Sequence, residues 1–63
     1  MMNKPTVELI GADGNAFGII GIVNKALKQD GQPERAEEWM GRAFSARSYD
    51  EILQLAFEYV EVE

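Results

Sequence analysis

The 63-residue sequence contains no cysteine and no histidine. Without cysteine, disulfides and thiolate sites for zinc or iron–sulfur clusters are excluded. Without histidine, the commonest general base and the commonest transition-metal ligand are missing, so Ser–His–Asp and Cys–His catalysis cannot occur within one chain. Carboxylates remain available for acid–base chemistry or for hard cations. We therefore predict a protein that is not an enzyme and that holds no cofactor or metal.

Basic residues are also scarce, since six of them face eleven acidic residues and leave a net charge of −5. This balance argues against direct binding of nucleic acid and would suit a basic protein partner. No apolar run approaches the roughly 18 residues that a membrane span needs. The start of the chain, Met-Met-Asn-Lys-Pro, lacks the apolar core of a signal peptide. We expect a cytoplasmic protein without a membrane partner.

A chain of this length allows one small domain, here residues 1–63, of which we expect residues 1–4 to be flexible. Residues 6–10 alternate in polarity and are rich in β-branched types, which predicts a strand with Val7 and Leu9 on one face. The ending Val-Glu-Val-Glu over residues 60–63 predicts a second strand, and the direction of pairing stays open. Three helices fit between them. The predicted fold is α+β, in the order strand–helix–helix–helix–strand, with the two terminal strands packed on the three helices.

Local signals place the helix ends. Asn15 or Asp13 can cap a first helix that runs from residue 16 to residue 29 or 30, and Gly31 stops it. A second helix opens at Pro33, and Ser48-Tyr-Asp-Glu matches a capping box that opens a third. The apolar residues predicted to face the core are Phe17, Ile20, Val23 and Leu27, then Ala36, Trp39, Met40, Ala43 and Phe44, then Tyr49, Ile52, Leu53, Ala56, Phe57 and Val60.

The segment Gly-Ala-Asp-Gly-Asn over residues 11–15 lies between a predicted strand and a predicted helix, where phosphate-binding loops occur. The glycine spacing differs from the dinucleotide fingerprint, and no Lys-Ser/Thr follows as in a P-loop. A tight turn with positive φ at Gly14 and a helix cap at Asn15 explains the segment more simply. The structural interpretation is therefore favoured over a ligand site.

The least expected feature is a stripe of Gly18, Gly21, Lys25 and Lys28 along the first helix. Each glycine inside a helix costs about 1 kcal/mol relative to alanine, which suggests that something approaches the backbone closely. Packing of the third helix or the terminal strand is the favoured explanation. A partner chain, or an anion held by the two lysines, is the functional alternative. With Gly14 and Asn15, these four residues form the candidate ligand or partner site.

A second candidate is the set of Trp39, Met40 and Phe44, because Trp and Met favour interfaces. Their helical spacing is more typical of a core. The first and third helices carry wide apolar arcs, so either the terminal strands or a second copy of the chain must cover the excess. Three acids, Glu8, Glu61 and Glu63, are predicted to share the outer face of the sheet, where a solvated surface is favoured over a cation or acid–base site.

Three strings of residues carry a resemblance. They are Val-Glu-Leu-Ile-Gly-Ala-Asp-Gly-Asn-Ala-Phe at residues 7–17, Tyr-Asp-x-Ile-Leu at 49–53, and the Val-Glu-Val-Glu ending. The chain resembles a group of short, acidic bacterial proteins of unassigned function, some carried by phages or mobile elements. The resemblance covers nearly the whole chain and implies no catalytic residue. It implies that the turn is a family feature.

Three functions follow from these observations. The first is a soluble, non-enzymatic interaction or accessory module, which binds a second copy of itself or a host or phage protein. The alternative is a small anion- or ligand-binding protein that uses the Gly11–Asn15 turn with Lys25 and Lys28. A hydrolase built on the carboxylates is the least favoured, because no nucleophile or oxyanion donor is predicted beside them.

Overall fold

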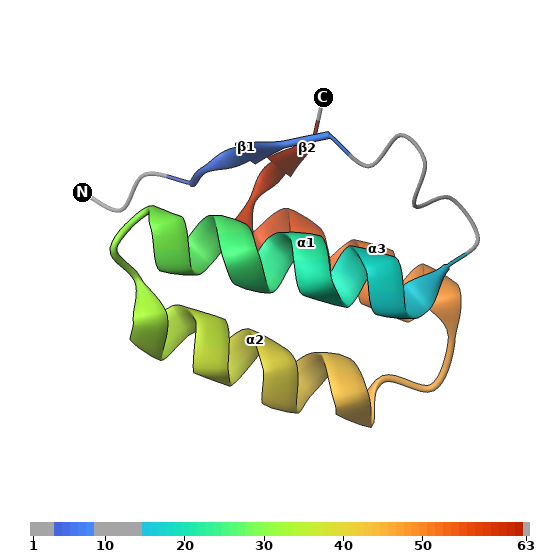
Figure 1. Ribbon diagram of the computed structural model, residues 1–63. Helices are drawn as coiled ribbons and strands as arrows, with labels where there is room; N and C mark the ends of the chain where they lie inside the picture. Colours follow the sequence, from blue (N-terminus) through green and yellow to red (C-terminus); the bar gives the residue numbers. More distant parts are fainter. Residues whose placement is uncertain (1–3, 9–14, 63) are drawn as a thin grey trace.

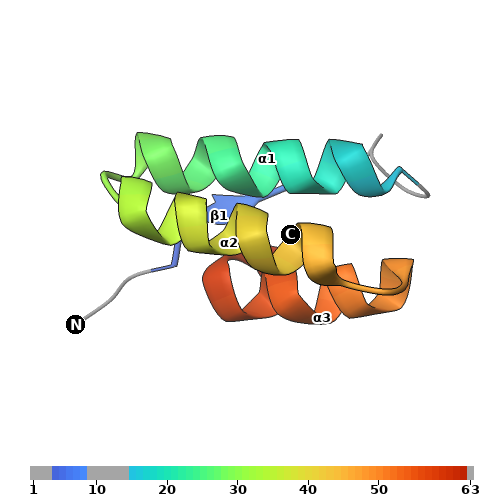
Figure 2. The same cartoon turned by 90° about the horizontal axis from the view of Figure 1, so that it is seen from below.

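The computed structural model describes residues 4–8 and 15–62, which form the predicted α+β fold. The two strands lie on α1 and α3, and α2 covers this helix pair from the opposite side (Figure 1). Seen from below, α2 crosses in front between α1 and α3 (Figure 2). No helix in these two ranges combines the length and apolarity that crossing a membrane requires. The elements are β1 (Thr6–Val7), α1 (Ala16–Gln29), α2 (Pro33–Ser45), α3 (Tyr49–Tyr59) and β2 (Glu61–Val62).

The two strands pair in parallel, which settles the direction that the sequence left open. Thr6 lies opposite Glu61 and Val7 opposite Val62, and the Glu61 N–H donates to the Pro5 carbonyl at 2.9 Å. Parallel strands need a crossover connection, which the three helices supply. Val7 is buried beneath the sheet, as predicted. The predictions at residues 9–14 and at Glu63 lie outside the described residues.

The end of α1 follows the sequence signals closely. The Gly31 N–H donates to the Lys28 carbonyl at 3.1 Å and the Gln32 N–H to the Leu27 carbonyl at 2.9 Å. These two bonds form a Schellman motif, which requires the left-handed φ of +75° found at Gly31. Pro33 then starts α2 at the position where its missing N–H costs nothing. The chain therefore reverses direction between antiparallel α1 and α2 (Figure 1).

The predicted N-terminal caps are present at α1 and α3. Asn15 Oδ1 accepts from the Gly18 N–H at 3.1 Å, and Ser48 Oγ accepts from the Glu51 N–H at 3.2 Å. The capping box differs from the expected form in one bond. The Glu51 carboxylate accepts from the Arg47 N–H at 2.8 Å, one residue before the cap. The box still satisfies two backbone donors at the start of α3.

The core forms around Trp39, whose side chain is fully buried between the three helices. Its indole Nε1–H donates to the Ile20 carbonyl of α1 at 3.0 Å, and its ring meets Tyr59 of α3 edge to face with centroids 5.6 Å apart. One residue of α2 thus contacts both other helices. The remaining buried residues are Val7, Ile19, Ile20, Val23, Leu27, Ala36, Ala43, Ile52, Ala56, Tyr59 and Val60.

All three phenylalanines that the sequence analysis assigned to the core, Phe17, Phe44 and Phe57, are exposed. On α1, Ile20, Val23 and Leu27 are buried as predicted, but Phe17 is 75% exposed, because it lies about 60° around the helix from Ile20, beyond the buried arc. On α3, Phe57 is 55% exposed and Tyr59 is buried. The core face of α3 is therefore rotated toward Tyr59 relative to the prediction.

The prediction of close packing within the chain is wrong for Gly21. This residue is exposed, and within residues 4–8 and 15–62 no atom beyond its own stretch of helix lies within 4 Å of the position that a Cβ would take. Gly41 on α2 has the same open surroundings. Neither Gly21 nor Gly41 is needed by the packing of the part of the chain that the structure describes, so this part does not explain the cost in helix stability.

We predict opposite effects for two Gly→Ala substitutions. Gly21→Ala should raise the free energy of unfolding by about 1 kcal/mol, because alanine is the better helix former and meets no neighbour. Gly31→Ala should lower it by about 1 kcal/mol, because alanine is strained in the left-handed region. Urea denaturation followed by circular dichroism measures both, at a protein concentration low enough that single chains are compared. Loss of stability with Gly21→Ala would contradict the open environment described here.

Candidate protein-interaction face

The antiparallel hairpin of α1 and α2 brings two exposed aromatic rings together. Phe17 lies in the first turn of α1 and Phe44 near the end of α2. Their ring centroids are 6.4 Å apart with a tilt of 48° between the planes, within the range of favourable aromatic pairs. They are nevertheless 75% and 60% exposed. The domain thus presents a pair of large apolar side chains to solvent.

A depression of about 350 Å³ lies between the two helices, and Met40, which lines it, precedes Phe44 by one helical turn. Phe17, Gly21, Asn24 and Lys28 follow one another at helical spacing on α1, and the α2 residues follow the same rule. Gly21 and Gly41 do not line this depression, but among the described residues no other segment approaches the position of a Cβ on either glycine. We refer to the following residues as the α1–α2 face: Phe17, Gly21, Asn24, Lys28, Pro33, Glu37, Met40, Gly41 and Phe44.

The charges of the α1–α2 face balance. Lys28 from α1 and Glu37 from α2 line the depression at the end away from the aromatic pair. Neither forms an ion pair among the residues that the structure describes. The face is therefore neutral, whereas the whole chain carries −5. Its two opposite charges are available for contacts outside the chain.

The sequence-predicted set of Trp39, Met40 and Phe44 separates in the structure. Trp39 is part of the core, so its assignment to a possible interface is wrong and the core interpretation is confirmed. For Phe44 the core interpretation is wrong, because this residue is exposed. Met40 is half-buried and lines the depression of the α1–α2 face. A thioether at this place supplies an adaptable apolar contact.

The predicted ligand site does not come together around one small anion. Gly14 lies outside the described residues, and Asn15 uses its side chain to cap α1. Lys28 is thirteen residues further along the same helix, about 20 Å away at 1.5 Å per residue. Lys25 lines a different depression, of about 250 Å³, between α1 and β1. Gly18 is half-buried near the start of α1.

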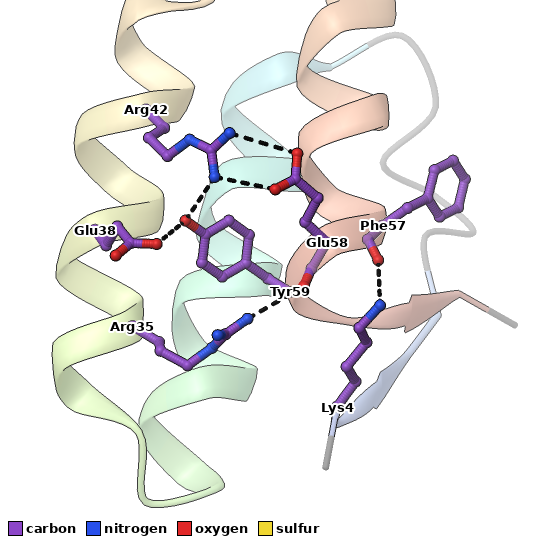
Figure 3. A network of polar contacts seen from close by, with 7 residues as sticks. All are labelled: Lys4, Arg35, Glu38, Arg42, Phe57, Glu58 and Tyr59. Atoms are coloured by element: carbon purple, nitrogen blue, oxygen red, sulfur yellow. Dashed lines mark hydrogen bonds and ion pairs between the residues drawn. The ribbon is translucent and has the colours of Figure 1, made fainter. Parts of the chain in front are cut away.

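A second polar arrangement joins α2 to α3 (Figure 3). Arg42 pairs with both oxygens of the Glu58 carboxylate, at 3.2 and 3.4 Å, and also donates to the Tyr59 hydroxyl at 3.1 Å. The Tyr59 hydroxyl in turn donates to the Glu38 carboxylate. We call these residues, together with Arg35, the α2–α3 clamp. Tyr59 can be buried in the core because its polar end reaches partners at the surface.

Cations also cover the C-terminal end of α3. The Arg35 guanidinium lies 4.7 Å from the centre of the Tyr59 ring and donates to the Glu58 carbonyl at 3.1 Å. The Lys4 ammonium donates to the Phe57 carbonyl at 2.9 Å (Figure 3). These carbonyls belong to the last turn of α3, where positive charge is favourable. The α2–α3 clamp therefore stabilises both a helix end and a helix–helix contact.

The clamp holds its groups in the protonation states that bind each other. Burial raises the pKa of the Tyr59 phenol, and the hydrogen bond to Glu38 raises it further, while Arg42 opposes the shift. The hydrogen bond to Tyr59, followed by that to Glu58, raises the pKa of Arg42. A neutral phenol is the form that donates to Glu38. The arrangement is that of a structural crosslink, because a raised pKa lowers the fraction of Tyr59 present as the nucleophilic phenolate.

The acidic face predicted for the sheet is present only in part. Glu61 is exposed on β2, Glu8 is exposed directly after β1, and Glu63 lies outside the described residues. Among residues 4–8 and 15–62, no three Asp or Glu side chains gather in a way that could hold a metal ion.

In comparisons with protein-family models, with curated proteins and with solved structures, no match to the chain was found. The resemblance to acidic phage-borne proteins therefore stays a prediction.

Sequence reasoning found parts of the α1–α2 face without combining them. Gly21 and Lys28 were assigned to one candidate site and Met40 and Phe44 to another. The signal that unites them is the short connection at residues 30–32, which makes α1 and α2 antiparallel neighbours. The start of α1 must then lie beside the end of α2. This rule places Phe17 next to Phe44.

We predict that Tyr59→Phe lowers the free energy of unfolding by about 1 kcal/mol at pH 7, through loss of the hydroxyl's hydrogen bonds. The folded-state pKa of Tyr59 is raised, so its contribution is complete below the unfolded-state pKa of about 10 and is lost as the pH rises above it. The difference in stability between wild type and variant should therefore narrow from pH 8 to pH 11. Denaturant titrations of both proteins over this range measure it, and a constant difference would contradict the clamp.

Proposed function

We propose that this chain is a non-enzymatic protein-interaction module that works in the cytoplasm and docks its partner on the α1–α2 face. The observation that carries the proposal is the contact between two largely exposed aromatic rings, Phe17 and Phe44. Single exposed apolar residues are ordinary on protein surfaces, whereas a contiguous apolar patch rimmed by polar groups is typical of an interaction site. Met40 extends this patch into the depression between the helices.

The two helical glycines support the same interpretation. Gly21 and Gly41 each cost about 1 kcal/mol of helix stability relative to alanine, and no other segment among the described residues approaches them. A partner that packs against the groove would approach the backbone at these two places. Small residues in a helix–helix groove permit such an approach, and an amphipathic helix is the partner element that fits a groove of this kind. The glycines are thus explained by a contact outside the chain.

The geometry gives less support to the alternative functions. A small-anion site would need the Gly11–Asn15 turn and the two lysines to converge, and Asn15 and Lys28 lie about 20 Å apart along one helix. A hydrolase would need carboxylates placed around a substrate cleft, whereas Glu61 is exposed on β2 and Glu8 is exposed directly after β1. No specific observation favours either function over protein binding.

A capture experiment with matched variants tests the proposal. Tagged wild-type protein, the double variant Phe17→Ser/Phe44→Ser and the control Phe57→Ser are exposed to extract of the native cell, and retained proteins are quantified by mass spectrometry. We expect the same proteins on wild type and on the Phe57→Ser control, with retention reduced at least tenfold on the double variant, because polar side chains remove the apolar patch. Untagged copies of the chain count among the retained proteins.

Phe57 is the appropriate control because it is an exposed phenylalanine on a different helix. Circular dichroism first establishes that all three proteins are folded. Equal retention of the same partners by wild type and by the folded double variant would overturn the α1–α2 face as the docking surface.

A further inference from the structure

We propose that the partner on the α1–α2 face is a second copy of this chain, related by a twofold axis parallel to α1 and α2. This inference rests on the proposed function, because it uses the same face. The observation behind it is the placement of the groups on the face. The aromatic pair lies at one end across both helices, and the opposite charges of Lys28 and Glu37 lie toward the other end, one on each helix.

A twofold axis along the groove makes this pattern complementary to itself. Rotation by 180° about that axis keeps each end of the groove at the same end and exchanges the α1 side with the α2 side. Phe17 then lies over Phe44 of the second copy, and the reciprocal contact is made as well. At the opposite end, Lys28 lies over Glu37 of the second copy, again twice. The aromatic rings thus meet aromatic rings and each charge meets an opposite charge, without any change in the structure of the chain.

The same rotation gives favourable helix geometry. Because α1 and α2 are antiparallel within one chain, α1 of one copy is also antiparallel to α2 of the other. The four helices would form an antiparallel four-helix arrangement, in which small residues let neighbouring helices approach closely. Gly21 and Gly41 lie on the face where the two helix pairs meet. Their open surroundings in the single chain would be filled by the second copy.

Charge favours this face over the rest of the surface for self-association. Each chain carries −5, so two copies repel one another over most orientations. On the α1–α2 face the one positive and the one negative charge that line the depression cancel. Two copies meeting there would replace repulsion by two ion pairs. The neutral face is thus suited to a second acidic chain, whereas a basic partner would favour the acidic parts of the surface.

The size of the domain agrees with a modest dimer. A standard interface buries about 800 Å² on each partner, which would be about a fifth of the 4269 Å² surface of this chain. Small domains without disulfides or metals often gain stability by association, and here the association would cover the two most exposed phenylalanines. We expect a dissociation constant in the micromolar range, at the weak end of the micromolar-to-picomolar range that interfaces of this size cover.

Sedimentation equilibrium on the full chain tests the inference, with one chain weighing 7.0 kDa. Wild type at several hundred micromolar should have twice that mass and should dissociate on dilution. Lys28→Glu and Glu37→Lys should each weaken the dimer at least tenfold, because each places two like-charged pairs across the axis. An equimolar mixture of the two variants should again form dimers, because both pairs are then of opposite charge.

Two controls match the charge changes. Lys25→Glu changes the net charge as Lys28→Glu does, and Glu61→Lys changes it as Glu37→Lys does, but both residues lie away from the groove. Both controls should dimerise as wild type does. All four substitutions are at exposed positions, so the fold is retained and the masses report association.

The results separate this inference from the proposed function. A wild-type chain that stays a monomer at millimolar concentration, or a variant mixture that fails to dimerise, overturns the second copy as the partner. If capture still depends on Phe17 and Phe44 in that case, the α1–α2 face keeps its role with a different protein. A dimer that is unaffected by Phe17→Ser/Phe44→Ser overturns this inference, and equal capture by wild type and that double variant overturns the proposed function as well.

Discussion

The structure depends on the burial of one indole ring. Trp39 is the largest fully buried side chain, and its N–H needs an acceptor inside the protein, which the Ile20 carbonyl supplies at 3.0 Å. This bond fixes α2 against α1, and the edge-to-face contact with Tyr59 fixes α2 against α3. A chain of 63 residues is expected to have an unfolding free energy of only about 3–9 kcal/mol. Burial of this one side chain is a large part of that total.

The position of Trp39 also decides what stays outside. With Trp39 between the helices, the α2 stripe turns so that Phe44 leaves the core and meets Phe17 at the surface. With Tyr59 beside Trp39, α3 turns so that Phe57 is exposed. The α2–α3 clamp makes the burial of Tyr59 favourable, because it provides hydrogen-bond partners for the tyrosine hydroxyl. All three phenylalanines are therefore exposed while the tryptophan and one tyrosine are buried, and the interaction face is a consequence of how the core is filled.

The sequence alone predicted those structural features that are determined by residues close together in the chain. Asn15, Gly31, Pro33 and Ser48 marked the helix ends because capping involves residues a few positions apart. The α+β order of elements followed from the same signals. The parallel pairing of the strands and the burial of Tyr59 were not predictable, because both depend on contacts between residues far apart in the chain.

For the candidate site, periodicity identified the exposed glycines and lysines but could not tell which apolar residue of a wide arc is left out of the core. A single spectroscopic measurement tests the α1–α2 face as the surface of association. The chain has three phenylalanines, so fluorine NMR of protein labelled with fluorophenylalanine gives three signals. The account predicts that the signals of Phe17 and Phe44 shift together as the concentration rises through the micromolar range, while that of Phe57 stays constant. Three signals that are independent of concentration, or a shift confined to Phe57, would contradict it.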